Sequence, residues 1–304
     1  MGGPKKIVDL IMSPPEAKPA WIETAILPKG GIFLFGGESK IGKSFLCLEM
    51  VRALATGTCL FGCEEFKVPD RARVLFIEQE LGEMMMHPRV TEIFGEEARE
   101  GRLPDLSEWM YYASKTGLDL SSPEGIKMLD EWIQEVRPNV IFLDPIGKLH
   151  SYSENDAGEI NKLFHTIQTF VQRYSELGLS FVISHHFGKL NPDPRAARDE
   201  LDPLNFRGSM RWVGDPDTII TIKRLRTTKQ KFPEGKKGRD GKDTYKWWEV
   251  KMKFVLRAGA EPDNCFCTIN RENDFRVRFK RFEEEEDENK ALPKAVRPLP
   301  RVGK

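Results

Sequence analysis

Residues 31–50 read GIFLFGGESKIGKSFLCLEM, and this stretch joins a short apolar run to a helical pattern through a glycine-rich turn. The run GIFLFGG predicts a buried strand, because it is apolar throughout and closes on two glycines. The segment KSFLCLEMVRALATG has helical spacing and reaches a glycine stop at Gly57. A strand, a tight turn and a helix are therefore expected in immediate succession.

The turn fits the pattern G-x-x-x-x-G-K-[ST] from Gly37 to Ser44 without a mismatch, which indicates a phosphate-binding loop for ATP. At a helix N-terminus, free N–H groups and partial positive charge suit phosphates. Gly42 lets the backbone come close to the phosphates, Lys43 is expected to bridge the β- and γ-phosphates, and Ser44 is expected to hold Mg2+. The candidate nucleotide-binding residues are Gly37, Glu38, Ser39, Lys40, Ile41, Gly42, Lys43, Ser44 and Phe45.

Acidic residues end two further apolar runs. The run NVIFLD supplies Asp144 at the end of a predicted strand, which is the position expected to hold Mg2+. The run VLFIEQE ends in Glu78 and Glu80, which strand alternation places on one face. Hydrolysis needs a group that orients the attacking water. Glu80 lies past the strand end and is favoured over Glu78 as this general base.

Two adjacent histidines, His185 and His186, follow the apolar run FVIS. Ligands of α/β sheets bind outside the carboxyl ends of the strands, so His185 is predicted to hydrogen-bond the γ-phosphate. Neighbouring side chains on a strand point in opposite directions, which disfavours a metal site made of both histidines. A histidine whose hydrogen bonds are satisfied within the fold remains the alternative interpretation.

The order of the predicted elements defines a fold class and a domain organisation. Strands and helices alternate up to about residue 205, and the continuous apolar strands favour an α/β fold with a mostly parallel sheet and helices on both faces. Later segments predict an antiparallel β extension at the C-terminal end. Residues 1–20 are expected to form an N-terminal arm, residues 21–282 an ATPase domain, and residues 283–304 a disordered acidic and Pro-rich tail.

The composition is that of a soluble globular protein, with 39% hydrophobic and 31% charged residues among 304. The N-terminus lacks the apolar region of a signal peptide, and no apolar run has the length of a membrane span. A cytoplasmic location without a membrane partner is therefore expected. The net charge is zero, but it is unevenly distributed along the chain, so a nucleic-acid partner is not excluded.

From Trp21 to Ile269 the chain resembles the RecA-like ATPases of the hexameric replicative helicase group, and in particular the plasmid RepA-type helicases. GGIFLFGGESKIGKS, VLFIEQE, VIFLDPI and VISHH occur in the family's order, and FRGSMRWVGDPDTIITIKR and FVLRAGAE follow them. The resemblance implies a RecA-like P-loop NTPase core in a homo-oligomeric ring, a hexamer. Such a ring translocates on single-stranded DNA and unwinds duplex DNA in plasmid or phage-type replication, with a separate primase or loader.

The resemblance also implies roles for single residues. It assigns phosphate and Mg2+ binding to Lys43 and Ser44, the Walker-B acid to Asp144, the general base to Glu80 and the γ-phosphate sensor to His185. Arg257 falls at the arginine finger, which reaches the nucleotide of the neighbouring subunit. Relatives often carry a lysine two residues earlier, where this chain has Val255, so Arg211 and Arg224 stay open as alternatives.

In rings of this fold the loops after the Walker-B strand and after the histidine strand face the centre, so the resemblance implies that residues 145–158 and 186–209 face DNA. Both loops also carry basic and aromatic side chains, which suit a single strand. The candidate nucleic-acid-binding residues are Lys148, Lys189, Arg195, Arg198, Arg207 and Gly208. A second class of function also remains open. In it, the chain is a RecA-like, ATP-dependent DNA-binding assembly, recombination or regulatory protein that does not unwind duplexes.

Overall fold

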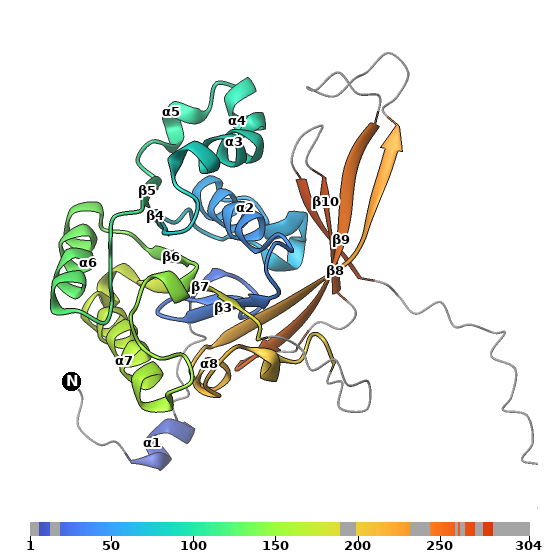
Figure 1. Cartoon of the computed structure of the whole chain (residues 1–304). Helices are drawn as coiled ribbons and strands as arrows, with labels where there is room; N and C mark the ends of the chain where they lie inside the picture. Colours follow the sequence, from blue (N-terminus) through green and yellow to red (C-terminus); the bar gives the residue numbers. More distant parts are fainter. Residues whose placement is uncertain are drawn as a thin grey trace, which may run out of the picture.

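A computed structural model describes the chain at residues 6–12, 19–188, 199–231, 244–258, 261, 265–270 and 276–281 (Figure 1). The expected tail at residues 283–304 lies outside these described residues. In the expected arm, the short apolar helix α1 spans Ile7–Met12. The proposed boundaries of arm, ATPase domain and tail remain predictions.

One large sheet organises the fold, with the strand order β11-β10-β9-β8-β3-β7-β6-β4-β5. The six strands from β8 to β5 run parallel to one another, whereas β9, β10 and β11 are antiparallel. The parallel strands are β3 (Ile32–Gly37), β4 (Val74–Glu78), β5 (Met110–Ser114), β6 (Val140–Asp144), β7 (Ser180–His186) and β8 (Thr218–Lys231). The antiparallel strands are β9 (Thr244–Leu256), β10 (Cys265–Asn270) and β11 (Arg276–Arg281).

This topology confirms the α/β class and the antiparallel extension, with one correction. The segment at residues 217–225 was expected to belong to the antiparallel part, but β8 pairs with β3 in parallel and with β9 in antiparallel. Strand β8 therefore joins the two halves of the sheet. A separate two-stranded sheet is formed by β1 (Ala20–Ile22) and β2 (Leu27–Pro28).

Helices cover both faces of the parallel strands (Figure 1), which explains why β3, β4, β6 and β7 are buried along nearly their whole length. On one face, Phe33 and Phe35 of β3 share a core with α2 (Lys43–Thr56) and α3 (Glu83–Ile93). On the other face, Ile32 and Leu34 share a core with α6 (Pro123–Val136) and α7 (Ala157–Arg173). The shorter helical elements are α4 (Gly95–Arg99), α5 (Leu103–Leu106), α8 (Arg211–Gly214), η1 (Leu60–Gly62), η2 (Glu64–Phe66), η3 (Ile146–Lys148), η4 (Ser175–Leu177) and η5 (Pro203–Asn205).

Local sequence signals fix the helix ends. The Ser122 hydroxyl accepts a hydrogen bond from the Gly125 N–H, and this caps the N-terminus of α6. Helix α2 ends at Gly57, whose φ of 75° suits a left-handed cap. The regular part of helix α7 ends at Arg173, and the separate turn η4 follows before Gly178. None of the described helices is long and apolar enough to span a bilayer.

The parallel register brings the functional strand ends to one edge of the sheet. Gly37 at the end of β3 pairs with His186 at the end of β7. Glu78 at the end of β4 pairs with Asp144 at the end of β6. All four strands point their carboxyl ends the same way, so the residues that follow them surround a single site.

Candidate nucleotide-binding site

The loop between β3 and α2 adopts a shape that only glycine allows at two positions. Gly42, the residue before the first turn of α2, has a φ of 109°. A Cβ atom on Gly37 would lie 2.4 Å from Ile41 Cδ1 and 2.7 Å from the Ile222 carbonyl oxygen. Both glycines of the sequence pattern are thus required by the backbone. The loop opens directly into the N-terminus of α2, as the pattern predicts.

The Lys43 ammonium group lies inside this loop and uses all three of its N–H donors. It donates to the carbonyl oxygens of Gly37 at 2.8 Å and Glu38 at 2.7 Å, and it lies 3.0 Å from His186 Nδ1. Burial lowers the pKa of Lys43 to about 8, against the opposing effect of nearby carboxylates, with Asp144 the largest. Phosphate oxygens would thus replace weaker, neutral partners of this cation.

The Asp144 carboxylate is buried behind Lys43 and is held by two hydroxyl groups. The hydroxyls of Ser184 and Ser44 both hydrogen-bond it. Burial raises the pKa of Asp144, and these hydrogen bonds together with the Lys43 charge oppose that rise. A carboxylate and a hydroxyl are the hard oxygen ligands that Mg2+ prefers, so Asp144 and Ser44 suit this ion.

Glu78 and Glu80 differ in what surrounds them. The Glu78 carboxylate is buried and accepts hydrogen bonds from the backbone N–H groups of Glu80, Leu81 and Gly82 and from the Ser114 hydroxyl. Glu80 is exposed, and its charge reaches Lys43 strongly enough to oppose the fall in that residue's pKa. Glu78 therefore shapes the loop after β4, and Glu80 remains available for a water molecule at the phosphates.

The two histidines point to opposite sides, and the one that faces the phosphate loop is not the predicted one. His185 is buried, and its Nε2 donates to the Arg207 carbonyl oxygen at 3.0 Å. Its ring stacks on Trp212 and Phe206, at centroid distances of 4.1 and 5.7 Å. His186 instead places Nδ1 beside Lys43. The geometry therefore favours His186 over His185 as the group that meets a γ-phosphate.

A sequence signal for this choice was present in β7. Ser184 and His186 stand two positions apart, so they share one face of the strand, and Ser184 holds Asp144. His185 falls on the other face with Ile183, which packs in the core under α6 and α7. Burial lowers the pKa of His185 to about 3 and that of His186 to about 4, where the Lys43 charge adds to the effect. Both rings are neutral at pH 7.

The candidate finger arginines lie in different places. Arg257 donates to the Gly214 and Asp215 carbonyl oxygens at 2.5 and 3.2 Å, so it caps the end of α8, and it pairs with Asp217 at 3.8 Å. This position is beside the amino end of β3, away from the phosphate loop. Arg211 stands in α8 itself, near Asp215. In contrast, Arg224 donates to the Lys40 carbonyl oxygen at 2.6 Å, within its own phosphate loop.

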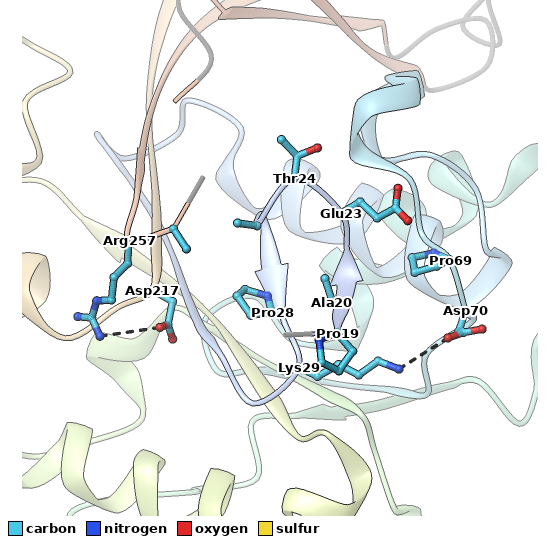
Figure 2. Close-up of a pocket in the computed structure, with 12 residues that line it drawn as sticks. Pro19, Ala20, Glu23, Thr24, Pro28, Lys29, Pro69, Asp70, Asp217 and Arg257 are labelled. Atoms are coloured by element: carbon cyan, nitrogen blue, oxygen red, sulfur yellow. Dashed lines mark ion pairs between the residues drawn. The ribbon is translucent and has the colours of Figure 1, made fainter. Parts of the chain in front are cut away.

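A cavity of about 840 Å³ opens beside Arg257, between the β1–β2 pair and the start of β8. Figure 2 shows Arg257 and Asp217 on one side of it and the ion pair of Lys29 with Asp70, at 3.7 Å, on the other. Each cation of the cavity wall is thus partnered by a carboxylate. The cavity lies at the opposite end of the sheet strands from the phosphate loop.

The described part of the predicted DNA-facing loops forms one connected surface. Lys148 is exposed on η3, and Arg207 is exposed beyond the end of β7. Gly208 has a φ of 94°, and a Cβ there would lie 2.0 Å from the Glu154 carbonyl oxygen. The two loops therefore touch at this glycine. The other candidate contacts, Lys189, Arg195 and Arg198, lie outside the described residues.

The match to a protein family agrees with this site. The AAA domain family matches residues 4–192, which is more than half of the chain. None of the curated proteins matches the sequence. Among solved structures, the flagellar accessory protein FlaH from Methanocaldococcus jannaschii is similar at 14% identity and a TM-score of 0.46, over 82% of this chain and 89% of that chain. The chain thus belongs to the AAA domain family and is a P-loop ATPase with a RecA-like core.

Proposed function

We propose that the protein is an ATP-driven motor that forms a ring, translocates on single-stranded DNA and separates duplex strands. The observation that carries this proposal is a short path from the phosphate loop to an exposed cation. His186 touches Lys43, and the His186 carbonyl oxygen accepts from the Arg207 N–H at 3.2 Å. The side chain of Arg207, at the end of that path, is exposed to solvent.

The residues around the phosphate loop supply what ATP hydrolysis requires. Lys43 would exchange its carbonyl partners for phosphate oxygens, which releases His186 Nδ1 to meet the γ-phosphate. Ser44 and Asp144 would hold Mg2+, which neutralises phosphate charge when it is bound. Glu80 would accept a proton from the attacking water. His186, which is neutral at pH 7, would distinguish ATP from ADP through a hydrogen bond.

The link to DNA runs through the backbone of one segment. Arg207 is held on both sides by the histidines, since its N–H donates to His186 and its carbonyl accepts from His185. A small displacement of His186 by the γ-phosphate therefore moves the segment that carries Arg207 and Gly208. Arg207 and Lys148 would contact DNA phosphates without regard to sequence, as tracking along a strand requires.

A ring would complete the site in trans. Arg257 lies at the opposite end of the sheet from the phosphate loop, so head-to-tail packing presents it to the next subunit's nucleotide. An arginine supplied in this way contributes a factor of about 10³–10⁵ to hydrolysis in related chemistry. Arg224 lies beside its own loop and would act on the nucleotide of its own subunit. A hexamer with a separate primase or loader stays part of this proposal.

A mixing experiment tests the arrangement in trans. Arg257→Ala subunits retain a phosphate loop, and Lys43→Ala subunits retain the arginine, so neither variant should hydrolyse ATP alone. Their mixture should recover part of the wild-type turnover, and Arg257→Ala should keep its affinity for ATP. A mixture as inactive as its components would argue against Arg257 as a finger.

Unwinding itself needs a separate assay. A forked duplex with a fluorophore and a quencher should open with ATP and wild-type protein, but not with Lys43→Ala. A strand-exchange assay run in parallel distinguishes the motor from an assembly or recombination protein. Strand exchange without unwinding would favour that second class.

A further inference from the structure

Glu154 holds the Arg207 side chain from the neighbouring loop. Its Oε2 lies 3.0 Å from Arg207 Nε, and the two side chains are 20% and 69% exposed. Its Oε1 rests against Gly147 of η3, where an added Cβ would approach that oxygen to 2.8 Å. The carboxylate therefore lies between Gly147 of η3 on one side and Arg207 on the other.

The backbone of the two loops is joined independently of this carboxylate. The Glu154 carbonyl oxygen accepts from the Ser209 N–H at 2.7 Å. Gly208 packs directly on the same carbonyl, which leaves no room for a side chain. The loops thus keep their contact when the carboxylate is replaced. Replacing the carboxylate should therefore change how readily the Arg207 side chain can bind another anion, without separating the loops.

We propose that Glu154 is a positioning residue that competes with DNA for Arg207. The inference rests on the proposed function, in which Arg207 contacts a DNA phosphate. Because the Arg207 side chain is mostly exposed, solvent screens this pair, and its main expected consequence is on DNA binding. The Glu154 carboxylate occupies the Arg207 Nε–H and offsets part of the guanidinium charge that a DNA phosphate would meet. Glu154 would then lower the affinity of the resting ATPase for single strands.

Two variants remove the competition in different ways. Glu154→Gln keeps the size of the side chain and removes its charge. Gly147→Ala keeps the charge and pushes Oε1 away from η3, which moves the flexible end of Glu154 and needs no unusual backbone angle at residue 147.

The matched control is Asp156→Asn, which removes one negative charge from an exposed position two residues further along the same loop. The Asp156 side chain caps α7 by accepting from the N–H groups of Gly158 and Glu159. Asparagine caps a helix about as well as aspartate, because its side-chain oxygen accepts the same hydrogen bonds. The control therefore changes the charge of the loop and keeps the start of α7.

The experiment measures the binding of a fluorescein-labelled oligothymidylate by anisotropy at low salt, without nucleotide. Glu154→Gln should bind about two- to fivefold more tightly than wild type, which corresponds to an exposed ion pair. Gly147→Ala should shift the affinity in the same direction by less. Asp156→Asn should change it by less than Glu154→Gln. In an Arg207→Gln background, the gain from Glu154→Gln should vanish.

Four results would overturn the proposal. Equal or weaker binding by Glu154→Gln would show that no competition exists. An equal gain in Asp156→Asn would assign the effect to net charge, and a gain that persists without the Arg207 guanidinium would assign it to another contact. Wild-type protein that fails to bind the oligonucleotide at any salt would refute the proposed function and this inference together. Binding by wild type with no effect of Glu154→Gln refutes the inference alone.

Discussion

Matched substitutions of Glu78 and Glu80 separate a structural carboxylate from a catalytic one. Glu78→Gln replaces one acceptor oxygen with an NH₂ group in a site that faces three backbone N–H donors and one hydroxyl. The Ser114 hydroxyl can rotate and accept a hydrogen bond from the new NH₂ group. At least one backbone N–H donor then has no partner. An unsatisfied buried donor costs about 1–3 kcal/mol.

Loss of the charge weakens the hydrogen bonds that remain, so Glu78→Gln should lower the free energy of unfolding by about 2–4 kcal/mol. Glu80 is exposed, and Glu80→Gln should change stability by less than about 0.5 kcal/mol. As the general base, however, Glu80 should contribute a factor of about 10²–10⁴ to kcat. One variant is thus expected to lose stability and the other to lose turnover.

Urea unfolding at equilibrium and steady-state ATP hydrolysis measure both quantities on the same preparations. Nucleotide binding by Glu80→Gln, followed with a fluorescent ATP analogue, should stay close to wild type and serves as the control. The reasoning would be refuted if Glu80→Gln kept wild-type turnover. A Glu78→Gln variant with full stability and no turnover would refute it as well, because the roles would then be exchanged.

Three further predictions follow from the same geometry. At pH 8, Lys43 is about half protonated in the free loop, so the binding of MgADP should be accompanied by the uptake of about half a proton. Calorimetry in buffers of different ionisation enthalpy measures this uptake, and its absence would contradict the prediction. The pKa of His185 is lowered on folding, so acid favours the unfolded state. The free energy of unfolding should fall by about 2 kcal/mol between pH 6.5 and 5 through this group. In His185→Phe the fall should be smaller by that amount, and the similar contribution of His186 should remain. Gly208→Ala should lower the free energy of unfolding in urea by more than about 1 kcal/mol, because the added Cβ would clash with the Glu154 carbonyl oxygen. Gly214→Ala should not lower it by this amount, because a Cβ at residue 214 would meet nothing within 4 Å.

Much of the fold follows from local patterns. Continuous apolar runs identified β3, β4, β6 and β7, because a strand that is buried on both faces carries apolar side chains on both. The glycine pattern placed the phosphate loop correctly between β3 and α2, because few other residues reach these backbone angles. The parallel pairing of β8 was missed, since a single strand can pair differently with each of its two neighbours.

The finer features of the site depend on contacts between distant segments. The spacing in β7 places Ser184 and His186 on one face, but that this face carries Asp144 and the phosphate loop follows only from the contacts of β7 with its neighbours. The spacing of Glu78 and Glu80 along the chain does not show which carboxylate accepts the hydrogen bonds. The donors come from a turn whose shape the sequence does not specify. The contact of Glu154 with Arg207 joins residues that are far apart in the chain, and nothing local marks it.

The central claim is that ATP hydrolysis at this site is coupled to single-stranded DNA. The direct test is the rate of ATP hydrolysis with and without an oligothymidylate at two salt concentrations, with the native mass of the assembly determined in parallel. We expect an oligomeric ring whose hydrolysis is strongly stimulated by the single strand, less so at high salt, and abolished in Lys43→Ala. Hydrolysis at the same rate with and without DNA, at both salt concentrations, would contradict it.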